Sequence, residues 1–345
     1  MMPHYTVGLM GSQDRARWDA FVHRCPDATF FHRAGWQQIM EESFSHPTWF
    51  MYAASAQGDI HAVLPLAQVR SRLFGNTLCS LPFCVYGGIA ADNRDAADAV
   101  DQAAQRLAAR LQVDHLEYRH LRPHHASWLH RDTYATFRKR LHADEQTNML
   151  AIPRKQRAMV RKGMAAGLIS IVEAGTDRFF DCYARSMHHL GTPMFNRRHF
   201  KLLQQVFADD CEVLGVEHGG RTVCAVLSFR FREQILPYYG GGGEQARQLA
   251  ANDFMYWEVM RRACNAGYTL FDFGRSKYGT GSFAFKKNWG FEPEPLHYDY
   301  QLHRARHLKE VQPLNPHYRL MIKAWRMLPL SWANLIGPHI VRQLG

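Results

Sequence analysis

The residues whose types and spacing best suit chemistry lie in one stretch, residues 271–291, which reads FDFGRSKYGTGSFAFKKNWGF. The carboxylate of Asp272 can accept or orient a proton, and the guanidinium of Arg275 can bind a phosphate or carboxylate through two hydrogen bonds. Lys286 and Lys287 add two positive charges beside aromatic rings. Charge and ring faces offered together are typical of a site for an anionic, partly planar ligand. The alternative is an ordinary strand, turn and helix with a solvated lysine pair.

The elements that would hold these side chains follow from the same stretch. Residues 270–273 alternate apolar and polar side chains, which predicts a short buried strand that ends at Gly274. Polar side chains that follow the carboxyl end of a strand lie where open α/β sheets bind their ligands. Gly279 and Gly281 indicate a turn, and the residues after them predict a short helix that ends at Gly290.

The same residues resemble the signature of a known family. Residues 285–291, FKKNWGF, resemble the FKKGFGG-type signature near the C-terminus of FemAB-type aminoacyl and acyl transferases. Residues 272–276 resemble the strand that precedes this signature, and residues 252–291 are similar to the branch associated with PEP-CTERM/exosortase systems. The resemblance is most specific over residues 152–300. It implies an acyl- or aminoacyltransferase with a GNAT-like fold.

The resemblance also implies roles for individual residues. Lys286 corresponds to the family lysine that neutralises charge at the scissile ester and the tRNA end, and Phe285 would stack beneath it. Asp272 would accept or orient a proton, or would only cap the turn that follows it. Lys286, Asp272 and Tyr239 form the candidate catalytic set. The candidate residues for binding donor or substrate are Phe285, Arg275, Ser276, Lys287, Trp289, Arg154, Lys155, Tyr183 and Asn252.

A run of four glycines bears on the acyl donor. Residues 238–243, YYGGGG, lead towards a helix expected over residues 253–266, with Asn252 as its N-cap. Glycines can bring backbone N–H groups close to the carbonyl of a donor, or they can form a flexible exit from a hairpin. The RxxGxG phosphate motif of acetyl-CoA users is absent. The donor, aminoacyl-tRNA or acyl-CoA, is therefore left open, and no permanently bound cofactor is expected.

Short matches in the same order indicate an internal duplication. The matched segments are 19–21 with 181–183, 31–33 with 195–197, 62–64 with 225–227, and 86–88 with 239–241. They predict two copies of one unit with the order strand, two helices, three-strand meander, helix, strand and helix, which resembles the GNAT-type N-acyltransferase fold. We therefore expect an α/β fold of two tandem GNAT-like domains with mixed sheets, at residues 1–150 and 151–300. A basic amphipathic tail, residues 301–345, would follow.

The composition indicates a globular protein with anionic partners. The chain has 345 residues, of which 46% are hydrophobic, and its formal net charge is +11. Such a balance favours nucleic acid, a nucleotide or an acidic membrane as a partner. The seven cysteines include no CxxC pair, and the pairs His124-His125 and His188-His189 lack matching carboxylates, so no metal site is expected. The absence of a signal peptide and of a long apolar run predicts a cytoplasmic protein.

Two basic segments offer surfaces to such partners. Residues 154–162 predict a helix with five basic side chains and no acidic one, which would either contact a polyanion or form a solvated face. Residues 315–345 interleave tryptophan and aliphatic side chains with arginine and lysine. This pattern indicates either a peripheral contact with the inner face of the cytoplasmic membrane or helices docked on the second domain. Pro329 and Pro338 favour two short helices over one long helix.

The resemblance and the composition together predict a function. We expect transfer of an acyl or aminoacyl group to an amine of a cell-envelope or exopolysaccharide precursor, such as a lipid-linked saccharide. An alternative enzyme is a CoA-dependent N-acyltransferase that acts on an amino sugar. An alternative from another class is a non-catalytic binder of RNA or of an anionic saccharide with the same fold.

Overall fold

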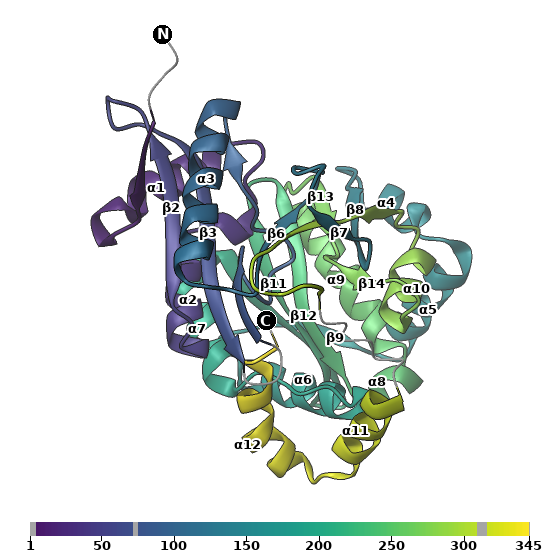
Figure 1. Cartoon of the computed structure of the whole chain (residues 1–345). Coiled ribbons are helices and arrows are strands. Elements are labelled where there is room, and N and C mark those ends of the chain that lie inside the picture. Colours follow the sequence, from purple (N-terminus) through teal and green to yellow (C-terminus); the bar gives the residue numbers. More distant parts are fainter. Residues whose placement is uncertain (1–4, 72–74, 309–315, 345) are drawn as a thin grey trace. The chain divides into compact units, whose positions relative to one another are not determined.

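The chain folds into two compact units. The computed structural model describes residues 5–71, 75–308 and 316–344, without the side chains of residues 316–319 (Figure 1). Unit 1 comprises residues 1–133, 295–311 and 342–345, and unit 2 comprises residues 134–294 and 312–341. Each unit contains a mixed sheet, of eight strands in the described residues, with helices packed against it.

Unit 1 is built on a sheet with one long helix across it. Its elements are β1 (Thr6–Leu9), the short helix η1 (Ser12–Asp14), α1 (Arg15–Arg24), the short helix η2 (Phe30–His32), α2 (Gly35–Phe44), β2 (Thr48–Ala54), β3 (Ile60–Ser71), β4 (Gly75–Cys79), β5 (Ala90–Ala91), α3 (Arg94–Arg110), β6 (His115–His120), β7 (Leu129–Arg131) and β16 (His297–Leu302). The strand order is β1-β2-β3-β4-β6-β16-β7, with β5 paired to β3. The alanine-rich α3 starts after the N-cap Asn93 and buries Val100 and Leu107 over β2 and β3 (Figure 1).

Unit 2 repeats this plan. Its elements are β8 (Tyr134–Arg140), α4 (Glu145–Ala151), α5 (Arg154–Ala165), β9 (Ile169–Glu173), α6 (Asp177–Leu190), α7 (Arg197–Phe207), the short helix η3 (Ala208–Asp210), β10 (Cys211–His218), β11 (Arg221–Phe231), β12 (Gln234–Gly242), α8 (Glu244–Gln248), α9 (Ala251–Asn265), β13 (Leu270–Asp272), β14 (Ser276–Lys277), α10 (Gly281–Asn288), β15 (Pro293–Pro295), α11 (Pro316–Met327) and α12 (Leu330–Val341). The strand order is β14-β8-β13-β12-β11-β10-β9, with β15 paired to β8. No helix in the described part of the chain is long and apolar enough to cross a membrane.

The two sheets confirm the predicted α/β class and mixed strand directions. In unit 1 the parallel pair is β4–β6, and in unit 2 it is β12–β13, while the strands that flank these pairs run antiparallel. The three strands predicted for the meander of the second copy are β10, β11 and β12. The helix predicted at the end of each copy occurs as α10 in unit 2. In unit 1 the strand β7 follows β6 instead, and no helix occurs within residues 121–133.

The units do not follow the boundaries expected from the sequence, because each sheet takes a strand from the other half of the chain. β8 precedes the expected boundary at residue 150 but pairs with β13 in unit 2. β16 follows the signature of the second copy but pairs with β6 in unit 1. The expected tail is likewise divided, since its first residues belong to β16 and only α11 and α12 form a helical segment. Pro329 lies between these two helices, whereas Pro338 lies inside α12.

Candidate active site

The candidate site lies where two parallel strands of unit 2 separate. β12 and β13 pair at Gln234–Leu270 and at Ile235–Phe271. Beyond these pairs β12 continues to Gly242 along β11, and none of the described strands pairs with its other edge. Backbone N–H and C=O groups without a strand partner need another hydrogen-bonding partner. This edge is therefore suited to hold the carbonyl of an acyl group.

Lys286 of α10 is anchored to the chain just after β13. Its Nζ donates hydrogen bonds to the carbonyl oxygens of Gly274, at 3.0 Å, and of Arg275, at 2.9 Å. The ammonium also lies 5.6 Å from the ring centre of Phe137 and 5.9 Å from that of Phe273. Burial of the charged group lowers the pKa of Lys286 from 10.5 to about 7. The side chain therefore changes its protonation state near neutral pH.

Asp272 shapes the turn that presents these carbonyl oxygens. Its Oδ1 accepts a hydrogen bond from the backbone N–H of Gly274 at 2.7 Å, so it does cap the turn. Its side chain is buried, and its negative charge raises the pKa of Lys286 against the stronger effect of burial. One carboxylate thus both fixes the turn and favours the protonated lysine.

Two more of the predicted residues lie in the same turn. Ser276 is buried in β14, and its Oγ has no hydrogen-bond partner among the described residues. A buried hydroxyl usually has a hydrogen-bond partner, and a bound water can supply it. The guanidinium of Arg275 lies 4.9 Å from the ring centre of Tyr134. The structure therefore gathers Asp272, Arg275, Ser276 and Lys286 around one turn at the end of β13.

The two aromatic residues predicted to bind the donor differ in their surroundings. Trp289 is fully buried, and its Nε1 donates a hydrogen bond to Oδ1 of Asp253 at 3.1 Å. It is a core residue, which corrects the expected ligand contact. Phe285 is only partly buried, and its ring centre lies 5.7 Å from that of Tyr256. Both rings lie on the same face of α10, but only the part of that face near Phe285 reaches the surface.

Tyr256 is a site residue that the sequence analysis did not single out. Its ring centre lies 4.8 Å from that of Phe273, and a Cβ on Gly240 would lie only 2.9 Å from its hydroxyl oxygen. Tyr256 thus spans from β12 to the chain after β13 at the point where these strands separate. Burial raises the pKa of Tyr256, so the phenol keeps its proton. An aromatic residue within the apolar helix α9 is typical of a core position, so its type and spacing gave no signal.

Packing on both faces of β12 accounts for three of the four glycines in the run. A Cβ on Gly241 would lie 2.8 Å from Cα of Tyr183, and one on Gly242 would lie 2.9 Å from Oδ1 of Asn252. Gly241 and Gly242 therefore let α6 and α9 approach the strand. Gly240, Gly241 and Gly242 all pair with β11 and so belong to the strand rather than to a flexible exit. Tyr239 contributes to an aromatic cluster on the α6 side, 6.1 Å from the ring centre of Tyr183. Burial raises the pKa of Tyr183.

The remaining predicted residues lie outside this turn. Arg154 and Lys155 are exposed on α5, and Lys287 is exposed on α10. Asn252 is the second residue of α9 and not its N-cap, because the helix begins earlier than expected, after Ala250. No group of three or more His, Cys, Asp or Glu residues within the described ranges is arranged to hold a metal ion.

Comparison with known families identifies the domain that carries this site. Residues 152–287 match the family model described as an acetyltransferase (GNAT) domain. This range includes β12, β13 and most of α10 with Lys286. No curated protein matches the chain in sequence.

Comparison with solved structures extends the likeness to both units. The crystal structure of FemX has a TM-score of 0.66 at 13% identity, covering 92% of this chain and 100% of that chain. The C-terminal DUF2156 domain assigned to a lysylphosphatidylglycerol synthetase of Agrobacterium fabrum has a TM-score of 0.56 at 15% identity, covering 84% and 92%. A tandem GNAT protein from the clavulanic acid biosynthesis pathway has a TM-score of 0.53 at 11% identity, covering 86% and 97%. The predicted likeness to FemAB-type transferases is thereby confirmed at the level of the fold, and residues 152–287 form a GNAT domain of the acyltransferase class.

Proposed function

We propose that unit 2 transfers an acyl or aminoacyl group to an amine, with Lys286 as the cation that stabilises the leaving group. The observation that carries this proposal is the position of Lys286, whose ammonium is anchored by two backbone carbonyls beside the separation of β12 and β13. An ammonium has three N–H donors, and the two carbonyls take two of them. The third is available to an oxygen or sulfur atom of the donor.

The transfer needs three groups that this site supplies. The neutral amine attacks the donor carbonyl, and the negative charge that forms on the carbonyl oxygen needs N–H donors. Backbone N–H groups along the edge of β12 that pairs with none of the described strands can offer them. When the bond to the leaving atom breaks, that atom takes up negative charge, and Lys286 stabilises it or gives it a proton. The proton lost by the attacking nitrogen replaces the one that Lys286 gives. Tyr256 and Phe285 would hold the acyl group between the strand and α10.

The proposal has two forms, which differ in the acyl donor. An aminoacyl-tRNA is supported by the FKKNWGF segment and by the exposed basic residues of α5. An acyl-CoA is supported by the acetyltransferase family match of residues 152–287. The absent RxxGxG motif favours the aminoacyl donor, as does the helix that follows β12, since α8 is only five residues long. Saturable turnover with either donor would distinguish an enzyme from a non-catalytic binder with this fold.

We further propose that the acceptor belongs to a cell-envelope or exopolysaccharide precursor attached to lipid. The support is the surface of α11 and α12 in unit 2. Large apolar side chains on these helices are exposed, among them Met327 at 85% and Trp332 at 59%. Trp325 and Ala333 are buried, and Nε2 of His188 on α6 lies 2.8 Å from the carbonyl oxygen of Leu328. The helices are therefore docked on unit 2 and still offer apolar and basic side chains to a membrane surface.

The proposed transfer is tested with both donors and one pair of variants. Purified protein is given aminoacyl-tRNA or acetyl-CoA with glucosamine as the acceptor amine, and release of deacylated tRNA or free CoA is followed. Lys286→Ala should lower the rate about 100-fold or more, because loss of one stabilising group costs a few kcal/mol of barrier. Lys201→Ala, which removes an exposed lysine of α7, should leave the rate unchanged. Equal rates in the wild type and a folded Lys286→Ala variant would refute the role of Lys286.

A further inference from the structure

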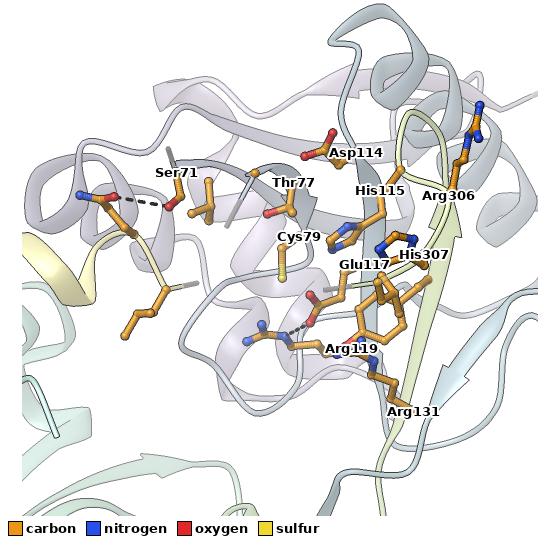
Figure 2. A pocket seen from close by; sticks show the side chains of 17 residues that line it. Ser71, Thr77, Cys79, Asp114, His115, Glu117, Arg119, Arg131, Arg306 and His307 are labelled. Atoms are coloured by element: carbon orange, nitrogen blue, oxygen red, sulfur yellow. Dashed lines mark hydrogen bonds and ion pairs between the residues drawn. The ribbon is translucent and has the colours of Figure 1, made fainter. Parts of the chain in front are cut away.

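Unit 1 contains a cavity that the proposed transfer does not use. Its volume is about 350 Å³, and it lies on one face of the sheet, over β4, β6 and β16 (Figure 2). Thr77 and Cys79 of β4 line it together with His115 and Glu117 of β6. Residues 305–308 and 343–344, also of unit 1, close its sides. Cavities of this size are at the lower end of the range for small-molecule sites.

The cavity lies at the position in unit 1 that corresponds to the end of β13 in unit 2. In the parallel pair of unit 2, Ile235 is opposite Phe271, and Asp272 is the next residue. In the parallel pair of unit 1, Leu78 is opposite Leu116, and the next residue is again a carboxylate, Glu117. The antiparallel pairs on the other side of β13 and β6 give the same correspondence. Phe271 is opposite Lys139 of β8, and Leu116 is opposite Gln301 of β16. The duplicated sheet thus keeps an acidic residue at the equivalent place in both units.

The surroundings of the two carboxylates differ. Glu117 forms an ion pair with the buried Arg119, from Nε to Oε1 at 2.7 Å, where unit 2 has a lysine near Asp272. Nη1 of Arg119 also donates to the carbonyl oxygens of Leu81 and Cys84. This guanidinium is held firmly and stays charged, so it cannot exchange a proton with a reacting group. The residue that stands near Glu117 in unit 1 is therefore suited to binding and not to proton transfer.

The charges along the cavity define what it can bind. The ion pair of Glu117 and Arg119 is neutral as a unit, and Oδ2 of Asp114 accepts a hydrogen bond from the backbone of Asn76 at 2.8 Å. Arg131 and Arg306 add two positive charges to the lining. Figure 2 shows Arg306 at one end of the lining side chains and Arg131 at the other, with His115, His307 and Glu117 between them. Fixed positive charge thus exceeds negative charge around a centre rich in hydrogen-bonding groups.

We propose that this cavity binds a sugar-sized molecule that carries one phosphate or carboxylate group. The anionic group pairs with Arg131 or Arg306, since a guanidinium binds both kinds of oxyanion through paired hydrogen bonds. Hydroxyl or amino groups of the same molecule donate to the carboxylate oxygens of Glu117, and a ring of His115 or His307 packs against its carbon face. All residues that line the cavity belong to unit 1, so binding there can be measured whichever donor unit 2 uses.

Direct binding measurements test the proposal without any transfer reaction. Isothermal titration of the full-length protein with glucosamine 6-phosphate, glucuronate and glucose compares a phosphate, a carboxylate and an uncharged sugar. At least one charged sugar should bind ten-fold or more tightly than glucose. Which of the two binds better tells whether phosphate or carboxylate is the natural group. If neither charged sugar binds more tightly than glucose, the proposal is wrong.

Variants locate the binding in unit 1. The double variant Arg131→Gln, Arg306→Gln should reduce the preference for the charged sugar at least ten-fold, because it removes both positive charges and leaves the buried ion pair intact. Arg94→Gln, at an arginine that is 92% exposed on α3 and does not line the cavity, is the matched control and should bind as the wild type does. Binding that is unchanged in the double variant would place the site elsewhere and overturn the proposal. The Lys286→Ala variant should bind the charged sugar as tightly as the wild type does. Failure of the proposed transfer would therefore not change the outcome of this binding test.

Discussion

At the scale of single residues, the proposed transfer depends on a lysine whose charged form is disfavoured by its surroundings. Water solvates an ammonium better than two carbonyls and two aromatic rings do, so burial lowers the pKa of Lys286 to about 7. Asp272 is the nearby group that acts against this shift. A group with a pKa close to the working pH is effective in proton transfer, because both of its forms are populated.

This pKa sets the expected pH dependence. If the protonated lysine stabilises the leaving group, the rate at saturating acceptor should fall as the pH rises through about 7, because Lys286 then loses its proton. In Lys286→Arg the guanidinium stays charged up to a much higher pH, so the remaining activity should lack this fall. The measurement is a profile of kcat from about pH 5.5 to about pH 9 for both forms. A rate that rises through neutral pH in the wild type but not in Lys286→Arg would instead make Lys286 a base.

Single residues also show how far the sequence could be interpreted. The candidates Asp272, Arg275 and Ser276 share one turn because they are close in sequence at a strand end, and Lys286 of α10 reaches this turn. Tyr239, the third member of the candidate catalytic set, lies instead in the aromatic cluster on the α6 side of β12. Trp289 was misjudged because the spacing along α10 gives two aromatic residues on one face but not the depth of each. Tyr256 was missed for a related reason, since it reaches the site from a helix whose pattern is that of a core element.

At the scale of elements, α5 is the best candidate for contact with a polyanion. Val160 and Gly163 are buried, and a Cβ on Gly163 would lie only 2.7 Å from Cβ of Phe254 on α9. The helix therefore packs through one face. Four basic side chains are exposed on the rest of it, and these are Arg154, Lys155, Arg161 and Lys162. The spacing of these basic residues is visible in the sequence. The face of α5 that packs against α9 could be assigned only from the position of α9 in the structure.

A salt titration tests this surface. If these four residues contact RNA phosphates, the logarithm of the binding constant for tRNA should fall steeply with the logarithm of the salt concentration. Changing all four to glutamine should reduce that slope by about 0.7 for each phosphate that is no longer neutralised. The matched control changes four other exposed basic residues of unit 2 to glutamine, namely Arg198, Lys201, Arg221 and Arg247. An equal slope in both variants would show that α5 is only a solvated face.

At the scale of the whole molecule, the duplication was predictable but its boundaries were not. Matched segments at near-constant offset indicate two copies of one unit, and both sheets have the same order of parallel and antiparallel pairs. The exchange of β8 and β16 leaves no such signal, because a strand has the same pattern whichever sheet it joins. Only the pairing of β8 with β13 and of β16 with β6 reveals it.

The surface of α11 and α12 gives a prediction for the full-length chain. Leu320, Met321 and Leu335 are exposed together with Met327 and Trp332, and basic side chains lie among them. We expect reversible binding to anionic lipid vesicles, because each basic residue near such a surface contributes about 1 kcal/mol and apolar burial adds to this. High salt should weaken the binding.

Co-sedimentation with vesicles provides the measurement. Changing Met327 and Trp332 to serine removes apolar surface without disturbing the buried Trp325 and Ala333, and it should release most of the bound protein. Leu129→Ser, at an exposed apolar residue of unit 1, is the control and should bind as the wild type does. Equal amounts of wild type and double variant in the pellet would argue against a membrane role for these helices.

The exchanged strands also constrain how the chain is made. During synthesis the ribosome releases β6 long before β16, so the sheet of unit 1 has an open edge at β6 until residues 297–302 have emerged. An unpaired edge can join with strands of other nascent chains, which leads to aggregation. Unit 2 has no such delay, because β8 is made before the strand that it joins. The first unit to be started is thus the last to be completed, and a chaperone that covers β6 during translation would favour correct assembly.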